Sequence, residues 1–220
     1  QSFIMHNTIK NLIYIEELIK SKANHNELAK IIAVSKTFPI ENVLPLIEYG
    51  HLHYGENKVQ EALDKWTDIK NDNQNIQLHL IGRLQTNKVK FALKIFDYIH
   101  SLDSEKLANK ISDEQQKHKK KPKIFIQVNL GNEVQKSGID KRNLNDFYKF
   151  CKTLNLDIIG TMCIPPNDGY TKKYFSEMSD INKKLNFKEL SMGMSEDYLE
   201  AIRYNATYIR VGSKIFGSRS

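Results

Sequence analysis

Lys36 is the residue of this 220-residue chain whose type and position best suit covalent chemistry. It follows an apolar run, and counting back by twos along an extended chain puts it on the same face as Val34 and Ile32. A buried ammonium is costly, and burial lowers the pKa of an amine until its lone pair can attack an aldehyde and form an imine. The alternative is an ordinary strand-end lysine that pairs with Glu56 or reaches solvent.

A glycine turn near the C-terminus is a second candidate feature. Gly212 and Ser213 stand between a predicted strand and a short apolar helical segment. Backbone N–H groups and a hydroxyl at such a turn suit a phosphate group. The segment from Ser191 to Ser195 follows the preceding predicted strand and offers further hydroxyls. The alternative is that both are ordinary strand-to-helix turns, with Ser195 capping a helix ahead of Glu196.

Other patterns that carry chemistry are weaker. The nucleotide-binding patterns GxxxxGK[ST] and GxGxxG and the hydrolase pattern GxSxG do not occur in the sequence. His51 and His53 share a strand face without an evident third ligand, so we expect no metal site, and we expect His79 to be packed or to act as a cap. Cys151 and Cys163 are too few for a disulfide framework or a zinc site, which indicates a reducing compartment.

Composition narrows the class of protein. Hydrophobic residues make up 40% of the chain and charged residues 27%, which is ordinary for a globular domain. The formal net charge is +7, but 28 of the 33 basic residues are lysines, whereas base readout depends mostly on arginine. A nucleic-acid-binding barrel is therefore the least favoured hypothesis. No apolar run reaches the roughly 18–20 residues of a membrane helix, and residues 1–10 do not resemble a signal peptide, so we expect a cytoplasmic protein.

The elements that must position these residues alternate along the chain. A helix is expected over Thr8–Lys22, and short apolar runs then alternate with stretches of 3.6-residue periodicity. Eight such alternations without a linker predict an α/β protein with a single (β/α)8 TIM barrel over residues 1–220; an open doubly wound sheet is the alternative. The expected strands are Lys30–Ser35, Leu52–Tyr54, Gln77–Leu80, Tyr98–His100, Lys123–Val128, Asp157–Thr161, Glu189–Leu190 and Tyr208–Arg210.

The residues that follow each strand would share one rim of such a barrel, the C-terminal face on which barrels keep their chemistry. Polar residues and glycines dominate these positions, which predicts a site on that rim. The positions are Lys36, Gly55–Asn57, Gly82–Arg83, Ser101, Asn129, Met162, Ser191–Gly193 and Val211–Ser213.

Six motifs, in order along the chain, carry a resemblance to a known family. They are Ala33–Thr37, Gly55–Glu61, His79–Lys88, Lys136–Ile139, Leu190–Ser195 and Arg210–Ser213. Through them nearly the whole chain resembles the pyridoxal phosphate homeostasis proteins, which are single-domain relatives of the N-terminal barrel of alanine racemase. The resemblance implies a pyridoxal-phosphate barrel of fold type III without the C-terminal β domain of the racemases.

The resemblance also implies how the cofactor would be held. Lys36 would hold pyridoxal 5′-phosphate as a Schiff base, Asn57 would lie near the ring, and Arg210 would face the pyridine nitrogen. An arginine cannot accept a proton and disfavours protonation of the ring, so the cofactor becomes a poorer electron sink than with an aspartate partner. This arrangement favours a protein that holds the cofactor over one that uses it for catalysis.

The phosphate of the cofactor would, by the same resemblance, be bound by Ser191, Gly212 and Ser213. Family members often carry threonine where this chain has Ser213, and either residue supplies the hydroxyl. The chain departs from the family at Phe38, where a lysine is usual. A second lysine that is proposed in the family to pass the cofactor on corresponds to Lys136, so any such relay would lack one member here.

The expected function is therefore reversible binding and delivery of pyridoxal phosphate inside the cell, without robust turnover of amino acids. Pyridoxal-phosphate-dependent apo-enzymes would be the acceptors, and a monomer is expected. The alternative is a small pyridoxal-phosphate-dependent racemase or lyase. Racemisation needs an acid/base group on the far face of the cofactor, which racemases take from a second domain that we do not expect in a chain of this length.

Overall fold

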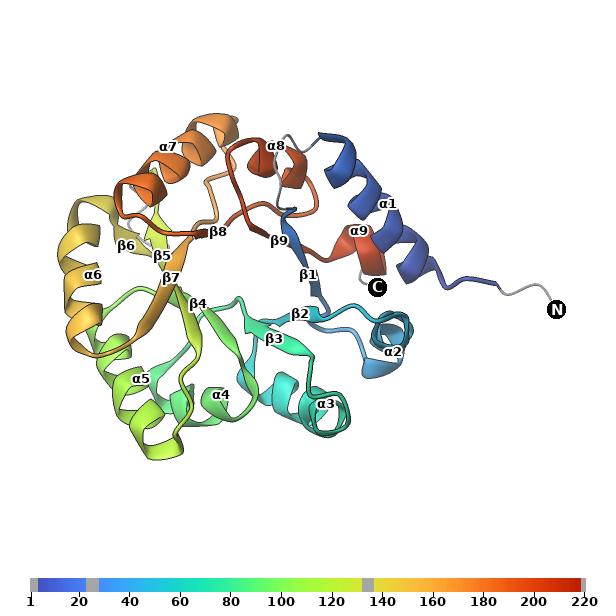
Figure 1. Ribbon diagram of the computed structural model, residues 1–220, viewed down its shortest axis with the longest axis horizontal. Coiled ribbons are helices and arrows are strands. Elements are labelled where there is room, and N and C mark those ends of the chain that lie inside the picture. Colours follow the sequence, from blue (N-terminus) through green and yellow to red (C-terminus); the bar gives the residue numbers. More distant parts are fainter. Residues whose placement is uncertain (1–3, 23–27, 132–136, 219–220) are drawn as a thin grey trace.

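The strands of the computed structural model form a closed parallel barrel (Figure 1), and the structure describes residues 4–22, 28–131 and 137–218. Neighbouring strands follow the order β4-β3-β2-β1-β9-β8-β7-β5, and pairing of β4 with β5 closes the ring. Closure excludes the open doubly wound sheet and confirms the (β/α)8 barrel. The barrel strands are β1 (Lys30–Val34), β2 (His53–Glu56), β3 (Gln77–Leu80), β4 (Tyr98–Leu102), β5 (Lys123–Asn129), β7 (Asp157–Met162), β8 (Glu189–Ser191) and β9 (Tyr208–Val211).

The expected strands are all present, and their ends differ from the predictions by at most two residues. One further strand, β6 (Ile139–Asp140), was not expected and pairs in parallel with the end of β5. Two residues are too few to give a period-2 pattern, which is why the sequence does not indicate this strand.

Helices surround the ring of strands, as the sequence pattern predicts (Figure 1). The first of them, α1, confirms the helix expected at the start of the chain. It packs against α9, close to the C-terminus, and Asn11 Nδ2 donates a hydrogen bond to Ile215 O at 2.9 Å. The helices are α1 (Asn7–Lys22), α2 (Ile40–Tyr49), α3 (Val59–Asp72), α4 (Val89–Ile95), α5 (Glu105–His118), α6 (Leu144–Thr153), α7 (Thr171–Lys184), α8 (Tyr198–Arg203) and α9 (Ser213–Phe216), with short 3-10 turns at Thr86–Lys88 and Lys141–Asn143.

Apolar side chains fill two separate regions. The larger core lies between the strands and the helices, and a smaller cluster fills the inside of the barrel. The inner cluster includes Tyr98 and Tyr208, the first residues of β4 and β9. These two rings lie at the N-terminal end of the barrel. The polar residues that follow the strands in the sequence lie at the C-terminal end.

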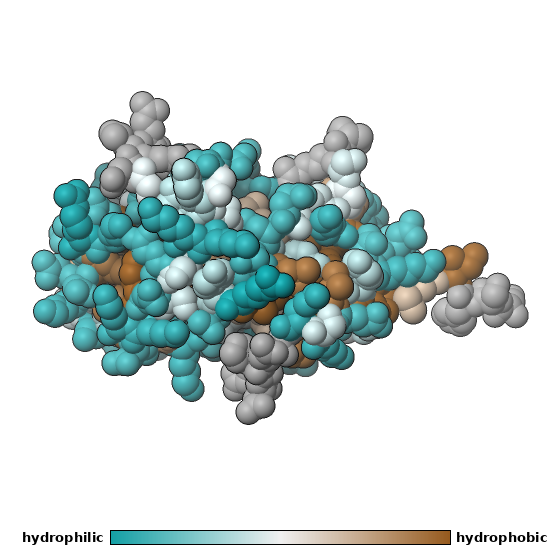
Figure 2. Space-filling view, turned by 90° about the horizontal axis from the view of Figure 1, so that it is seen from above, coloured by the Kyte–Doolittle hydropathy of each residue, from teal (hydrophilic) through white to brown (hydrophobic). Residues whose placement is uncertain are grey.

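The face drawn in Figure 2 is mainly hydrophilic, with apolar residues confined to small areas between polar ones. A surface of this kind agrees with lysines spread over helices as solvated charges. Within the described part of the chain, none of the helices combines the length and the apolar character needed to cross a bilayer.

Candidate functional site

A cavity of about 560 Å³ opens at the C-terminal ends of the strands, on the rim where the sequence predicts a site. Pockets for small molecules usually measure roughly 300–1,000 Å³. Five of the six residues that the resemblance implies as cofactor ligands line this cavity. They are Lys36, Asn57, Arg210, Gly212 and Ser213.

Lys36 lies half-buried in the turn after β1, and the residues on both sides of it are held by carboxylates from the end of β2 and the first turn of α3. Before it, the Ser35 hydroxyl donates a hydrogen bond to Glu56 Oε2 at 2.5 Å. After it, Thr37 adopts a φ of 67°, in the left-handed region, and its N–H donates to Glu61 Oε2 at 2.7 Å. The motif Gly55–Glu61 therefore fixes the turn that presents Lys36 to the cavity.

Glu56 itself is fully buried and contacts α3. Its carboxylate forms an ion pair with Lys65 at 2.9 Å and accepts a hydrogen bond from Trp66 Nε1, also at 2.9 Å. Lys65 Nζ in turn donates to Ser35 O at 2.6 Å. The contacts of the Glu56 carboxylate all fall on Oε2, whereas the buried Oε1 has no hydrogen-bond partner among the described residues. The contacts of Oε2 tie the end of β1, β2 and α3 together directly behind the Lys36 turn.

Replacing Glu56 by glutamine is expected to destabilise the protein by about 3 kcal/mol, because the buried Lys65 ammonium loses the nearer of its charge partners and is left with Glu61, at 3.6 Å. The free energy of unfolding, measured by urea denaturation, checks this prediction. Glu48→Gln is the matched control: Glu48 is exposed, and its replacement should change stability by less than about 0.5 kcal/mol. Equal effects of the two substitutions would contradict a stabilising role for the buried pair.

Arg210 brings a buried positive charge to the floor of the cavity. Its side chain lies in β9 and is 3% exposed. Nη1 donates to Ser191 Oγ at 2.5 Å and Nη2 donates to the Cys163 carbonyl at 3.0 Å, so both acceptors are neutral. Burial lowers the pKa of Arg210 from its usual value, but an arginine stays protonated in proteins. The guanidinium is therefore a charged hydrogen-bond donor for an anion, or for an atom with a lone pair, that binds in the cavity.

Ser191, the sixth implied ligand, is not brought to the cavity. It is the last residue of β8, is fully buried, and lies behind Arg210. Its Oγ is engaged by Arg210 and by His100 Nδ1, the latter at 2.9 Å. The predicted strand ended one residue too early, so that Ser191 was counted among the rim residues when it belongs to the strand.

Ser195, four residues further on, does line the cavity together with Gly212 and Ser213. Its Oγ accepts a hydrogen bond from the backbone N–H of Lys214 at 3.3 Å. The alternative of a helix cap at Ser195 is wrong, because α8 begins at Tyr198 and Asp197 holds the cap position. The sequence signal that identifies Ser195 is its place in the loop after β8, on the same rim as Ser213.

Asn57 lines the cavity in close backbone contact with a glycine from the neighbouring strand end, Gly82. Asn57 follows β2, and Gly82 follows β3. A Cβ atom on Gly82 would lie 2.6 Å from the Asn57 carbonyl oxygen, so any larger residue would displace the backbone at Asn57. Arg83, the next residue, also lines the cavity, with its side chain exposed.

Phe38, the position at which the chain departs from the family, also lines the cavity and stacks on Phe216 with ring centroids 5.3 Å apart. An aromatic wall therefore stands where a lysine is usual in the family. Lys136 lies outside the described residues.

The histidines and cysteines singled out in the sequence occupy other places. His51 Nε2 is hydrogen-bonded to Ile31 O at 2.9 Å, and His53 bonds to His79 inside the barrel, which confirms His79 as a packed residue. Among the described residues, no group of three or more His, Cys, Asp or Glu side chains is arranged to hold a metal ion. Burial raises the pKa of both thiols, Cys151 and Cys163, to about 12, so neither is activated as a nucleophile.

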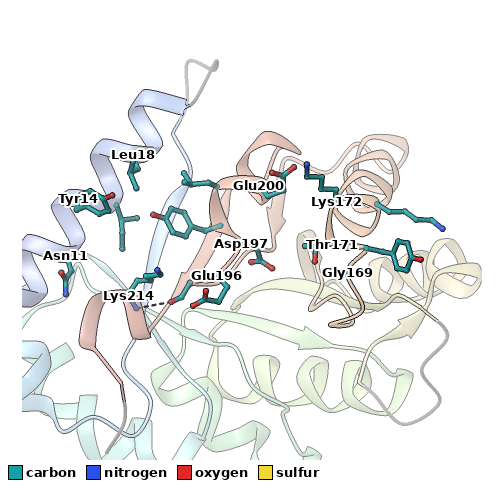
Figure 3. A pocket seen from close by; sticks show the side chains of 16 residues that line it. Asn11, Tyr14, Leu18, Gly169, Thr171, Lys172, Glu196, Asp197, Glu200 and Lys214 are labelled. Carbon is teal, nitrogen blue, oxygen red and sulfur yellow. Dashed lines mark hydrogen bonds between the residues drawn. The ribbon is translucent and has the colours of Figure 1, made fainter.

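A larger groove of about 800 Å³ lies beside the cavity, between α1, α8 and the start of α7 (Figure 3). Its walls carry Tyr14, Leu18 and Lys172, and it shares Ser195 and Glu196 with the cavity. Size alone would favour this groove as the site. Lys36 and Arg210 both line the smaller cavity, however, and convergent polar groups at strand ends are the stronger indication of chemistry in a barrel.

Comparison with known proteins gives consistent similarities. The family model described as alanine racemase, N-terminal domain, matches residues 14–220. A pyridoxal phosphate homeostasis protein of Aquifex aeolicus is 35% identical over 215 residues, which cover 93% of each chain.

Solved structures show the same barrel. The structure of PipY of Synechococcus elongatus with pyridoxal phosphate bound has a TM-score of 0.85 at 31% identity, covering 96% of this chain and all of PipY. An alanine racemase of Clostridium difficile has a TM-score of 0.75 at 15% identity, covering 97% of this chain and 57% of the racemase. The first is similar in sequence and fold, and the second shares the fold.

Proposed function

Since the chain belongs to the pyridoxal phosphate homeostasis proteins, within the alanine racemase N-terminal domain family, we propose that it binds pyridoxal 5′-phosphate reversibly as a Schiff base on Lys36. It holds the cofactor and releases it to pyridoxal-phosphate-dependent apo-enzymes, without robust turnover of amino acids. We further propose that it acts in the cytoplasm as a monomer and that residues 1–220 function as one cofactor-binding domain.

The observation that carries this proposal is the convergence of three kinds of group in one cavity. Lys36 supplies an amine, Arg210 a buried charged donor, and the Gly212–Ser213 turn a hydroxyl at the start of a helix. Pyridoxal phosphate has a matching aldehyde, ring nitrogen and phosphate. The donor set therefore fits this cofactor.

Each residue has a distinct task in this proposal. The Lys36 amine condenses with the aldehyde and releases one water molecule, and hydrolysis reverses the step. Asn57 lies beside the ring, and Gly212 and Ser213 bind the phosphate. Ser195 takes the place that the sequence gave to Ser191, because its hydroxyl lines the cavity next to this turn.

Arg210 supports a holder over an enzyme. When bound, pyridoxal phosphate supplies enzymes with an electron sink, whose strength depends on protonation of the ring nitrogen. A guanidinium donates hydrogen bonds and cannot accept a proton, so it keeps the ring nitrogen unprotonated. The names of the relatives, which are homeostasis proteins, agree with this view.

The proposed function is tested by incubating the purified protein with pyridoxal phosphate, reducing it with borohydride and mapping the modified lysine by mass spectrometry. We expect one reduced adduct, on Lys36, and no product when the loaded protein is incubated with amino acids. Absence of an adduct would refute the proposed covalent attachment. Steady racemisation or lyase turnover would instead favour a small pyridoxal-phosphate-dependent enzyme.

Replacing Ser195 by alanine is expected to weaken binding of pyridoxal phosphate by about fivefold to tenfold, because a hydrogen bond to the charged phosphate is lost. Binding of pyridoxal, which lacks the phosphate, should change little in the same variant. Equilibrium titration of the visible absorbance measures both affinities. Equal losses for the two compounds would argue against a phosphate contact at Ser195.

A further inference from the structure

Polar side chains form a continuous hydrogen-bonded row through the inside of the barrel. His53 Nδ1 lies 2.9 Å from His79 Nε2, His79 Nδ1 lies 2.9 Å from His100 Nε2, and His100 Nδ1 lies 2.9 Å from Ser191 Oγ. Ser191 Oγ then accepts from Arg210 Nη1 at 2.5 Å. The row thus leads from the first residue of β2 to the arginine that lines the cofactor cavity.

Aromatic rings enclose this row. His79 stacks on Tyr98 with centroids 4.1 Å apart, and His100 stacks on Phe125 at 4.3 Å. Both imidazoles are fully buried, and His53, at the N-terminal end of the barrel, is half-buried. The row is therefore partly exposed only at its His53 end, within the residues that compose it.

The three imidazoles are neutral at neutral pH. Burial lowers the pKa of His53 to about 4, with His51, Lys30 and Lys123 adding repulsion. Burial also lowers the pKa values of His79 and His100 well below the usual value, and for His100 the Arg210 charge lowers it further. A neutral imidazole has one N–H donor and one acceptor nitrogen.

The hydrogen bonds of the row must therefore all run in one direction, and Arg210 sets that direction. Arg210 only donates, and within the described part of the chain Ser191 Oγ has two partners, Arg210 Nη1 and His100 Nδ1. If the hydroxyl accepted from both, its own buried proton would have no acceptor, so it donates that proton to His100 Nδ1. His100 then carries its proton on Nε2 and donates to His79, which in the same way donates from Nε2 to His53.

We infer that His53, His79, His100 and Ser191 act as one positioning unit for Arg210, so that the orientation of the guanidinium in the cofactor cavity depends on residues at the far end of the barrel. The four residues are positioning residues, since only Arg210 reaches the cavity. This inference rests on the proposed function for its effect on cofactor binding, but the order of the protons stands independently of it.

A physical need explains such a unit. The buried guanidinium has the Cys163 carbonyl and the Ser191 hydroxyl as its neutral acceptors. A hydroxyl that is free to rotate is a weak anchor, whereas one whose proton is committed to His100 presents its lone pair to Arg210 in a fixed direction. Since each imidazole orients the next, breaking the row at any member loosens this anchor.

The proton order is tested first, by 15N NMR of the cofactor-free protein labelled at histidine nitrogens. Neutral Nε2–H and Nδ1–H imidazoles give different 15N shifts, and we expect His53, His79 and His100 all to carry the proton on Nε2. An Nδ1 proton on His100, or shifts averaged between the two forms, would overturn the inference whether or not the protein binds pyridoxal phosphate.

The long-range effect is tested with variants of His79, which does not line the cavity. His79→Phe keeps the stacking on Tyr98 and breaks the row. We expect the 15N shifts of His100 to change, because its Nε2–H loses its acceptor, and binding of pyridoxal phosphate to weaken by about tenfold. His79→Gln, whose amide has one acceptor and one donor end, should restore most of both readouts. The control Tyr98→Phe removes a hydroxyl outside the row and should leave both unchanged.

The outcomes separate this inference from the proposed function. If wild-type protein fails to bind pyridoxal phosphate, the proposed function fails, and the NMR result still decides the proton order. If His79→Phe does not fold, His53→Phe is the second variant. It removes the half-buried end member of the row, which costs less buried polar surface, and the same loss of affinity is expected. Unchanged affinity for pyridoxal phosphate and unchanged 15N shifts of His100, in a folded variant whose row is interrupted, would overturn the inference.

Discussion

Replacing Lys36 by alanine is expected to abolish covalent attachment of pyridoxal phosphate. The variant should give no borohydride-stable adduct and no visible absorbance band, because Lys36 supplies the only side-chain amine among the described residues that line the cavity. Its affinity for the cofactor should fall by more than about tenfold. Stability should change by less than about 1 kcal/mol, since the side chain is only half-buried in a turn. Absorption spectra, mass spectrometry and urea denaturation measure the three quantities.

The matched control is Lys58→Ala. Lys58 is an exposed lysine next to Asn57 that lines a neighbouring groove, so it tests whether a lysine close to the cavity, but outside it, captures the aldehyde. We expect this variant to form the adduct on Lys36 as the wild type does. Two results would contradict the assignment: an adduct that still forms in Lys36→Ala, or an adduct on Lys36 that is lost in Lys58→Ala.

The fold could be predicted in detail because its determinants are local. Short apolar runs such as Ile31–Val34 are buried on both faces of a barrel strand, and the stretches between them have helical periodicity. Eight alternations favour a closed barrel and leave an open doubly wound sheet as the alternative. The pairing of β4 with β5 that closes the ring is a long-range contact, and only the structure displays it.

The candidate site was predicted less completely, and Ser191 shows why. The strand that contains it is three residues long, so an error of one residue at its end moves a side chain from the rim to the barrel interior. For Ser195 the sequence leaves open a phosphate contact or a helix cap, and the cap is excluded only by the start of α8 at Tyr198. Strand ends are set by pairing with neighbours, here Ser191 with Tyr208, and that information is not local.

The side-chain contacts behind the site could not be predicted from the sequence for a related reason, because they join residues from different strands and helices. Glu56 was considered as a partner of Lys36 because both follow predicted strands, but its side chain points to α3 and pairs with Lys65. The sequence pairs His53 with His51 and leaves His79 by itself. Nothing in the spacing shows that β2 and β3 are staggered so as to bring the His53 and His79 rings together.

Replacing Arg210 by glutamine is expected to weaken binding of pyridoxal phosphate by about tenfold or more while the adduct on Lys36 still forms. The amide can donate to Ser191 but carries no charge, and a hydrogen bond from a charged donor contributes about 1.5–3 kcal/mol. Because the cation that disfavours protonation of the ring nitrogen is gone, the pKa of that nitrogen, followed by absorbance of the loaded protein, should rise. Equilibrium titration gives the affinity.

Arg83→Gln separates the buried charge of Arg210 from the general positive field of the cavity. Arg83 lines the same cavity, but its side chain is exposed, so water screens its charge and its loss should weaken binding by less than about threefold. If the two variants lost affinity equally and neither changed the pKa of the ring nitrogen, Arg210 would act only as one cation among several. A rise in that pKa confined to Arg210→Gln would instead place the guanidinium at the ring nitrogen, which is the contact on which the proposed holding role depends.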